Sequence, residues 1–187
     1  MKKFTKNAAA AIATVANARA EAVLASGKPS KIPATLPRFA ARIADEWKIC
    51  AEIGADLDRV VSAVEKSNIY AVEKIAKILE ALNAGNAELL DVHTRQICMN
   101  AAPAASMQNT KARAAVSSEC GGEGISVITG DRVRRTYRAS TASTQTSSTR
   151  SALDALGLLS EYRSRSREFT FADSKGAHML FALFSEE

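Results

Sequence analysis

An apolar stripe in the middle of the chain constrains the fold more than any other feature of the sequence. Its aliphatic residues recur at steps of three and four, and they are Leu57, Val60, Val61, Val64, Val72, Ile75, Ile78, Leu79 and Leu82. This spacing places them on one face of helical segments, so the middle of the chain is predicted to be helical. The stripe is interpreted either as one side of a helical hairpin or bundle, or as the seam of a dimer. The sequence alone does not separate these two alternatives.

The composition agrees with a helical core. Apolar residues make up 47% of the 187 residues and aromatic residues only 5%, and alanine is abundant. A core built from small and aliphatic side chains is typical of packed helices. The length allows one domain of ordinary size or two small ones. We expect a mainly α protein, in which an N-terminal helical bundle or set of dimerisation helices is followed by a small α+β domain.

The chain divides into three segments by composition. Residues 1–37 are predicted to form a basic, Ala-rich helix over residues 7–25 and a Pro-rich arm, because three prolines and a glycine fall within residues 27–37. Residues 38–105 form the helical region for packing or oligomerisation. Residues 106–187 change in pattern to short elements joined by polar turns, and are predicted to form a nucleic-acid-binding domain.

Basic residues are concentrated in the two outer segments. Residues 1–37 carry six basic residues and one acidic residue, whereas residues 38–100 carry eight and ten. Residues 111–175 carry eleven basic and seven acidic residues, with no acidic residue between Arg132 and Leu153. This distribution predicts contact with a polyanion at the ends of the chain and packing or self-association at its centre.

The sharpest candidate for chemistry lies within residues 146–171. The predicted helix that begins at Thr146 opens with hydroxyl residues, which donate hydrogen bonds to phosphates at a helix start, and ends with leucines that anchor it. Arg150 is suited to a bidentate contact with guanine. A predicted hairpin follows, and three arginines at alternate positions would project from its same face: Arg163, Arg165 and Arg167.

From residue 109 onward the sequence predicts a helix (109–118), a short strand (125–128), a helix (132–137), a Ser/Thr-rich polar turn, a helix and a basic hairpin. This order resembles the winged helix-turn-helix domain of bacterial and phage regulators. In that comparison residues 146–158 match the recognition helix and residues 162–171 match the wing. The resemblance implies DNA contacts from Arg132, Arg134, Arg135, Arg138, Gln145, Thr146, Ser147, Ser148, Thr149, Arg150, Arg163, Arg165 and Arg167.

These observations predict a cytoplasmic, sequence-specific regulator of transcription or replication that binds double-stranded DNA. Its helical middle would form a homodimer or bind a protein partner, and an origin in a phage or mobile element fits the lack of catalytic equipment. The alternative is a non-enzymatic helical structural or interaction protein of a virion or capsid-associated assembly. The Ala-rich helix, the Pro-rich arm and the apolar stripe all suit docking onto another protein.

Enzymatic, metal-binding and membrane-spanning functions find little support in the sequence. The cysteines Cys50, Cys98 and Cys120 are far apart and are predicted to be reduced thiols. A pairing of His93 with Cys98 or Cys120 lacks a third, orienting group. Residues 121–124 lack the Lys-Ser/Thr of a phosphate-binding loop. No apolar run approaches the length of a membrane span. We therefore expect no enzyme, no cofactor, no metal and no membrane contact.

Overall fold

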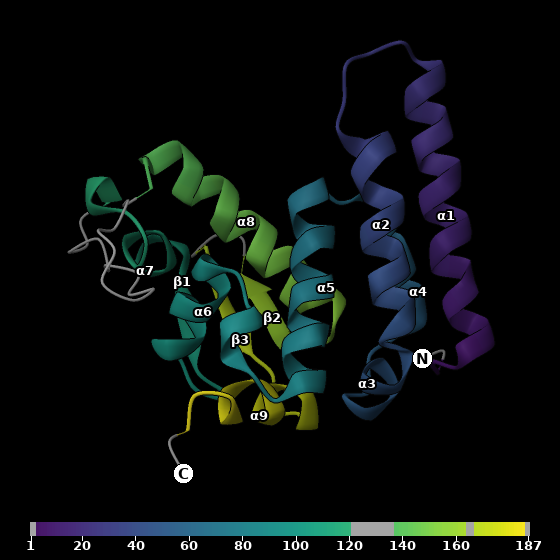
Figure 1. Ribbon diagram of the computed structural model, residues 1–187. Coiled ribbons are helices and arrows are strands. Elements are labelled where there is room, and N and C mark those ends of the chain that lie inside the picture. The colour runs from purple at the N-terminus through teal and green to yellow at the C-terminus, as the bar shows by residue number, and fades with distance from the viewer. Residues whose placement is uncertain (1–2, 121–136, 164–166, 186–187) are drawn as a thin grey trace.

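The computed structural model describes residues 3–120, 137–163 and 167–185 of the chain (Figure 1). The N-terminal half is built from helices α1 (Lys6–Ala25), α2 (Ile32–Asp45), α3 (Trp47–Glu52), α4 (Leu57–Lys66) and α5 (Ile69–Ala84). α1 and α2 form an antiparallel hairpin, and α5 stands between this hairpin and the C-terminal half. Within the described residues, no helix has both the length and the apolar character needed to span a lipid bilayer.

The apolar stripe predicted from the sequence is buried within a single chain. Its fully buried members are Val60, Val64, Val72, Ile75, Ile78 and Leu79. The stripe is divided between α4 and α5, because Ser67 is the C-cap of α4 and Asn68 is the N-cap of α5. The Oδ1 atom of Asn68 accepts a hydrogen bond from the backbone N–H of Ala71 at 2.9 Å, which satisfies a donor at the start of α5. Of the two predicted alternatives, the bundle within the chain is confirmed.

The Pro-rich arm expected at residues 27–37 is shorter than predicted. Only residues 26–31 connect the first two helices, and residues 32–37 belong to α2. Pro33 occupies the first turn, where a backbone N–H has no helical partner to lose. Pro37 lies inside the helix. Burial of the α2 face that carries Leu36, Ala40 and Ile43 stabilises the helix despite this second proline.

Helix α1 packs against α2 and α4 instead of standing apart from them. Arg19 donates from Nη1 to the carbonyl of Val64 at 2.6 Å and from Nη2 to the carbonyl of Ser67 at 2.8 Å. Carbonyls at a helix C-terminus have no partner within the helix, and a cation there is electrostatically favourable. A single guanidinium therefore ties the N-terminal helix to the end of α4.

The C-terminal half combines short helices with a three-stranded antiparallel sheet in the order β1-β3-β2. In the register, Phe169 of β3 pairs with Met107 on one side and with Tyr162 on the other. The predicted hairpin is confirmed, although its first strand begins earlier, at Leu159. The elements are a 3-10 turn (Ala87–Leu89), α6 (Val92–Met99), β1 (Ser106–Gln108), α7 (Asn109–Ala114), a second 3-10 turn (Ser118–Cys120), α8 (Ala139–Ala155), β2 (Leu159–Arg163), β3 (Glu168–Phe171) and α9 (Lys175–Ala182).

One hydrophobic core runs through both halves of the molecule. It extends from Phe4 to Leu180, and α8 packs along α5. Helix α9 is also in close contact with the bundle. A Cβ atom added to Gly176 would lie 2.9 Å from the Cβ of Ile53 and 2.8 Å from Cδ2 of Leu158. The change of sequence pattern near residue 105 therefore does not correspond to a gap in packing.

Helix α8 begins earlier than predicted. The Ser/Thr-rich residues 139–145, expected as a polar turn, form its first two turns. Small residues of one face are buried, namely Ala142, Thr146, Thr149 and Ala152, and their size allows α8 to approach its neighbours closely. Tertiary packing of this face thus overrides the weak helix propensity of serine and threonine. The strand predicted at residues 125–128 and residues 132–136 of the next predicted helix lie outside the described residues, and Tyr137 is not in a helix.

Candidate nucleic-acid interface

A polar pocket opens where α7, α8 and the start of β3 meet. Its volume is about 250 Å³, and its described lining consists of Asn109, Arg113, Ser143, Thr146, Ser147, Arg150 and Arg167. Three of these residues carry guanidinium groups, and none of the described ones carries a carboxylate. Cations gathered in a concave, partly desolvated site attract anions more strongly than the same cations spread over a convex surface.

Helical periodicity explains why these residues meet. On α8 the lining residues follow the i, i+3, i+4, i+7 spacing of one helix face, at Ser143, Thr146, Ser147 and Arg150. On α7, Asn109 and Arg113 are four residues apart and share a face in the same way. The backbone N–H of Asn109 donates to the carbonyl of Arg167 at 2.8 Å. This hydrogen bond fixes the start of α7 against the residue that precedes β3.

Two polar atoms in the pocket wall have no hydrogen-bond partner among the described residues. They are Oδ1 of Asn109 and Nε of Arg113, and both are buried. A buried polar group left unpaired costs about 1–3 kcal/mol. Such groups in native proteins are usually satisfied by water or by a ligand.

Behind the pocket, a buried imidazole anchors α8. His93 of α6 is fully buried. Its Nε2 lies 3.1 Å from Oγ1 of Thr146, and its Nδ1 lies 2.9 Å from Oγ1 of Thr149. Burial, followed by the nearby charge of Lys74, lowers the pKa of His93 to about 3, so the ring is neutral at physiological pH. A hydroxyl can donate or accept, so both ring nitrogens of the neutral imidazole are paired.

A buried ion pair fixes the backbone around His93. Lys74 of α5 pairs with Asp91, which caps α6 by accepting from the backbone N–H groups of His93 at 3.1 Å and Thr94 at 3.2 Å. Burial lowers the pKa of Lys74, although Asp91 acts in the opposite direction. Burial acts to raise the pKa of Asp91, but Lys74 and Thr94 together outweigh it and hold this pKa below its usual value. The pair therefore connects α5, α6 and the wall of the pocket.

The predicted contact residues of α8 lie on two faces of the helix. Ser147 is exposed, and Gln145 and Arg150 are half-buried. Thr146, Ser148 and Thr149 are buried. The hydroxyl of Ser148 lies 2.8 Å from the carbonyl of Thr144 and 3.1 Å from Oδ1 of Asn68. Ser148 and Thr149 therefore contact α5 and α6 instead of facing a groove, and they are left out of the interface proposed below.

The predicted arginines are distributed over several places. Arg138 is exposed at the N-cap of α8, Arg163 ends β2, and Arg167 is exposed immediately before β3. Arg132, Arg134, Arg135 and Arg165 lie outside the described residues. Of all the predicted contact residues, the pocket brings together Thr146, Ser147, Arg150 and Arg167.

The pocket is completed by Asn109, Arg113 and Ser143, which are not among the contact residues predicted from the sequence. The helix predicted from residue 109 already implies that Asn109 and Arg113 share a face. Their meeting with Arg150 and Arg167 depends on the contact of α7 with α8 and on the turn before β3. The spacing of residues within one helix does not predict these contacts between separate elements.

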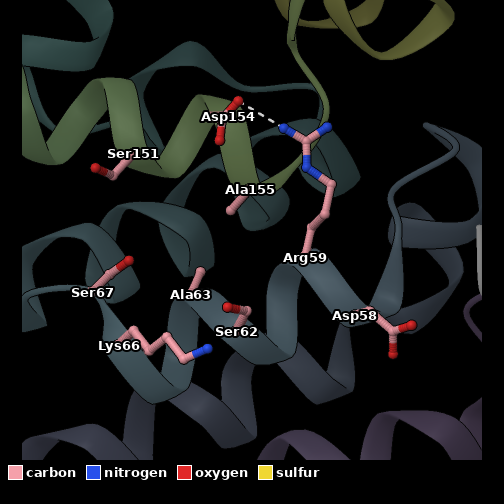
Figure 2. Close-up of a pocket in the computed structure, with 9 residues that line it drawn as sticks. All are labelled: Asp58, Arg59, Ser62, Ala63, Lys66, Ser67, Ser151, Asp154 and Ala155. Carbon is pink, nitrogen blue, oxygen red and sulfur yellow. Dashed lines mark hydrogen bonds and ion pairs between the residues drawn. The ribbon is translucent and has the colours of Figure 1, made fainter.

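A larger pocket between α4 and α8 differs from the pocket beside α7 in the charge of its lining residues. Its volume is about 430 Å³. Figure 2 shows Arg59 extending toward Asp154 across this pocket, with an N–O distance of 2.7 Å. The described lining also includes Asp58 and Lys66, so its two carboxylates balance its two cations. The pocket beside α7 is therefore the better candidate for a polyanion.

Comparison with protein-family models, with curated proteins and with solved structures finds no match to this chain. Across residues 3–120, 137–163 and 167–185, no group of three or more His, Cys, Asp or Glu side chains is arranged to hold a metal ion. Burial raises the pKa of the Cys98 thiol, which keeps it protonated. The functional argument therefore depends on the arginine-lined pocket and the helix that forms its wall.

Proposed function

We propose that this protein binds double-stranded DNA through α8, the hairpin β2–β3 and the pocket beside α7. The observation that carries the proposal is the convergence of Arg113, Arg150 and Arg167, from α7, α8 and the segment before β3, on one concave site. Backbone phosphates supply most of the affinity in protein–DNA complexes. The planar guanidinium presents paired donors that match phosphate oxygens and guanine.

The outer face of α8 supports this proposal. Over residues 139–150 its exposed side chains are short and carry hydroxyl groups, at Ser140, Thr141, Thr144 and Ser147, whereas the exposed Asp154 near the end of the helix pairs with Arg59. Such a face fits the width of the major groove and donates to phosphates and base edges. The opposite face is fixed to α5 and α6, so the helix is held rigidly while its outer face remains accessible.

The order of elements supports the same proposal. Among the described residues, α6, β1, α7, α8 and the hairpin β2–β3 come in the order helix, strand, helix, helix and hairpin. The same order of element types underlies the winged helix-turn-helix resemblance, in which the sequence assigned the first helix, the strand and the second helix to residues 109–118, 125–128 and 132–137; here the comparison uses α6, β1 and α7. In this comparison α8 is the recognition helix and β2–β3 is the wing. A role as a regulator of transcription or replication follows from the resemblance and forms part of the proposal.

The alternative role as a structural interaction protein has less support. One of its three supports was an exposed apolar stripe, and that stripe is buried within the chain. Among the described residues, the large apolar side chains that are exposed lie on four different elements, at Leu24, Tyr70, Leu89 and Met99. Single exposed apolar residues are normal on soluble proteins and do not by themselves indicate a docking surface.

The proposal is tested by selecting bound duplexes from a random library at physiological salt. The affinity of an enriched duplex is then measured by fluorescence anisotropy over a range of salt concentrations. Contacts to four to six phosphates predict that log K falls linearly with log[salt], with a slope of about −4 to −5. An unselected duplex of equal length should bind more weakly. Failure to enrich any sequence, or binding that does not depend on salt, would contradict the proposal.

A further inference from the structure

The basic N-terminal segment carries cations that the proposed DNA interface does not use. Arg19 is bound by two carbonyls at the end of α4. Lys28 and Lys31 lie instead in the loop of residues 26–31 that joins α1 to α2, and both are exposed. Neither ammonium group has an ion-pair or hydrogen-bond partner among the described residues. This hairpin loop therefore presents two uncompensated positive charges to solvent.

The sequence around the hairpin loop contains no acidic residue that would oppose these charges. Between Glu21 and Asp45 every charged side chain is basic. Arg42 is paired with a carboxylate of α5. Arg38 is exposed, but it lies seven residues beyond Lys31 along α2, which is about 10 Å. Exposed charges at such a distance are largely screened from each other at physiological salt. The hairpin loop is therefore a local cationic site.

Short-range hydrogen bonds and backbone restrictions hold the hairpin loop in one shape. Gly27 has a φ of 66°, and its N–H donates to the carbonyl of Leu24 at 3.1 Å, which ends α1. The hydroxyl oxygen of Ser30 accepts from the N–H of Ile32 at 3.2 Å at the start of α2. The ring of Pro29 fixes its own φ. The two lysines are thus carried by an ordered turn, so binding costs little backbone freedom.

The chemistry of the hairpin loop favours a nucleic-acid backbone over a lipid surface. An ammonium group is a compact point charge that binds phosphate without reading a base. Attachment to a lipid surface requires buried apolar area in addition to cations. Within residues 3–45, Leu24 is the one large apolar side chain that is exposed. A phosphodiester backbone therefore fits the loop better.

The hairpin loop and α8 are placed so that one extended ligand can reach both. In Figure 1 the two form the upper edge of the molecule, on opposite sides of α5. Duplex DNA is stiff over lengths of about 150 base pairs. A duplex that lies along this edge contacts α8 with one segment and the hairpin loop with a neighbouring segment.

We propose that Lys28 and Lys31 of the hairpin loop bind the phosphate backbone of DNA that flanks the sequence contacted by α8. This inference rests on the proposed function and divides its interface into two parts. The part formed by α8 discriminates between sequences, whereas the hairpin loop adds affinity for every sequence, because phosphate contacts carry no sequence information directly.

The test is an anisotropy titration of Lys28→Gln/Lys31→Gln with two duplexes over a range of salt concentrations. Both contain the enriched sequence, and the longer one extends beyond it by about ten base pairs, or about 34 Å, on each side. On the longer duplex, the slope of log K against log[salt] should become less steep by about 1 for each lysine. On the shorter duplex, the variant should bind like the wild type. The preference for the enriched over an unselected sequence should be unchanged.

Two controls remove positive charge from other places. Lys3→Gln/Lys6→Gln removes two exposed lysines of the same N-terminal segment at the other end of α1, a helix of 20 residues and therefore about 30 Å in length. Arg38→Gln removes one charge from an exposed position on α2. Both controls should keep the wild-type slope. Circular dichroism verifies that all variants are folded.

The proposal is overturned if Lys28→Gln/Lys31→Gln keeps the wild-type slope on the longer duplex, or if it loses as much on the shorter one. It is also overturned if Lys3→Gln/Lys6→Gln has the same effect. Binding to anionic phospholipid vesicles that these loop substitutions abolish, with DNA binding unchanged, would replace DNA by a lipid surface as the occupant.

Failure of this proposal is distinguishable from failure of the proposed function. An enriched duplex that the wild type and the loop variant bind alike removes the loop contact and leaves the proposed function standing. Salt-dependent binding of unselected duplexes that only the loop variant weakens, with no sequence enriched, contradicts sequence-specific binding and supports the loop contact. A wild type that binds no duplex contradicts both.

Discussion

The Nε2 atom of His93 lies 3.1 Å from the hydroxyl oxygen of Thr146, and Thr146 lines the arginine-rich pocket. A fully buried imidazole is therefore one hydrogen bond away from the pocket proposed to bind DNA. The other ring nitrogen meets Thr149 one turn further along α8. These two contacts orient α8 on α6 and determine which of its faces is exposed.

The stability of the protein should fall as the solution becomes acidic through the normal titration range of histidine. The pKa of His93 is lowered from 6.5 to about 3, so below pH 6.5 the unfolded chain binds a proton that the folded protein excludes. The contribution of His93 is complete above pH 6.5 and is lost progressively between pH 6.5 and about 3. Linkage predicts a slope of up to about 1.4 kcal/mol per pH unit. Urea denaturation at several pH values measures it.

A His93→Gln variant separates this effect from the titration of carboxylates. Glutamine retains a donor and an acceptor but does not titrate. Its free energy of unfolding should therefore depend less steeply on pH than that of the wild type between pH 6.5 and 4. Identical slopes for the two proteins would show that His93 is not kept neutral by the fold.

Thr149→Val should destabilise the protein by about 1–3 kcal/mol, because it leaves Nδ1 of His93 buried without its partner while preserving side-chain shape. Ser147→Ala is the matched control, since Ser147 is exposed on the same helix, and it should change stability by less than about 0.5 kcal/mol. Urea denaturation measures both. Equal effects of the two substitutions would contradict the buried polar contact.

Replacing Lys74, the lysine of the buried ion pair, should lower the free energy of unfolding more than Thr149→Val does. Lys74→Met leaves Asp91 without its counter-ion, and breaking such a pair typically costs about 3–5 kcal/mol. Adding Asp91→Asn removes the unpaired charge and retains an N-capping side chain, so the double variant should recover part of the lost stability. Thermal and urea denaturation measure the stability of the single and the double variant. A double variant less stable than Lys74→Met would be inconsistent with the described pair.

Gly176→Ala tests whether α9 is packed against the helical bundle. The added methyl group would lie 2.9 Å from the Cβ of Ile53, and this overpacking should outweigh the better helix propensity of alanine, with a net loss of about 1–2 kcal/mol. Ala182→Ser, at an exposed position of the same helix, serves as the control. If Gly176→Ala is as stable as the wild type, α9 does not approach Ile53 so closely.

The sequence predicted those parts of the fold that depend on local periodicity. The spacing from Leu57 to Leu82 identified the buried face of α4 and α5, and the alternating pattern after Leu159 identified the hairpin. These features are visible because one helix face or one strand face must be buried. The division of the stripe at Asn68 could also be anticipated from capping chemistry, since asparagine is a favoured N-cap.

Other parts depend on contacts between elements far apart in the chain. The hydroxyl residues of α8 were expected to form a turn and a groove-facing helix start, because serine and threonine are weak helix formers. Their inner members instead satisfy His93 of α6 and Asn68 of α5. Similarly, Arg113 joins Arg150 only because α7 packs on α8. Four of the seven described lining residues were thus among the predicted contact residues, and the other three required the tertiary structure.

The central claim is that the exposed face of α8 and the arginine pocket bind duplex DNA, and anisotropy titration of an enriched duplex tests it most directly. Arg150→Ala should weaken binding by about 1–3 kcal/mol and relax discrimination at one base pair, whereas Arg167→Asn should weaken binding to all duplexes similarly. The control Arg38→Gln should bind like the wild type. If both pocket variants bind every duplex as tightly as the wild type, the claim is contradicted.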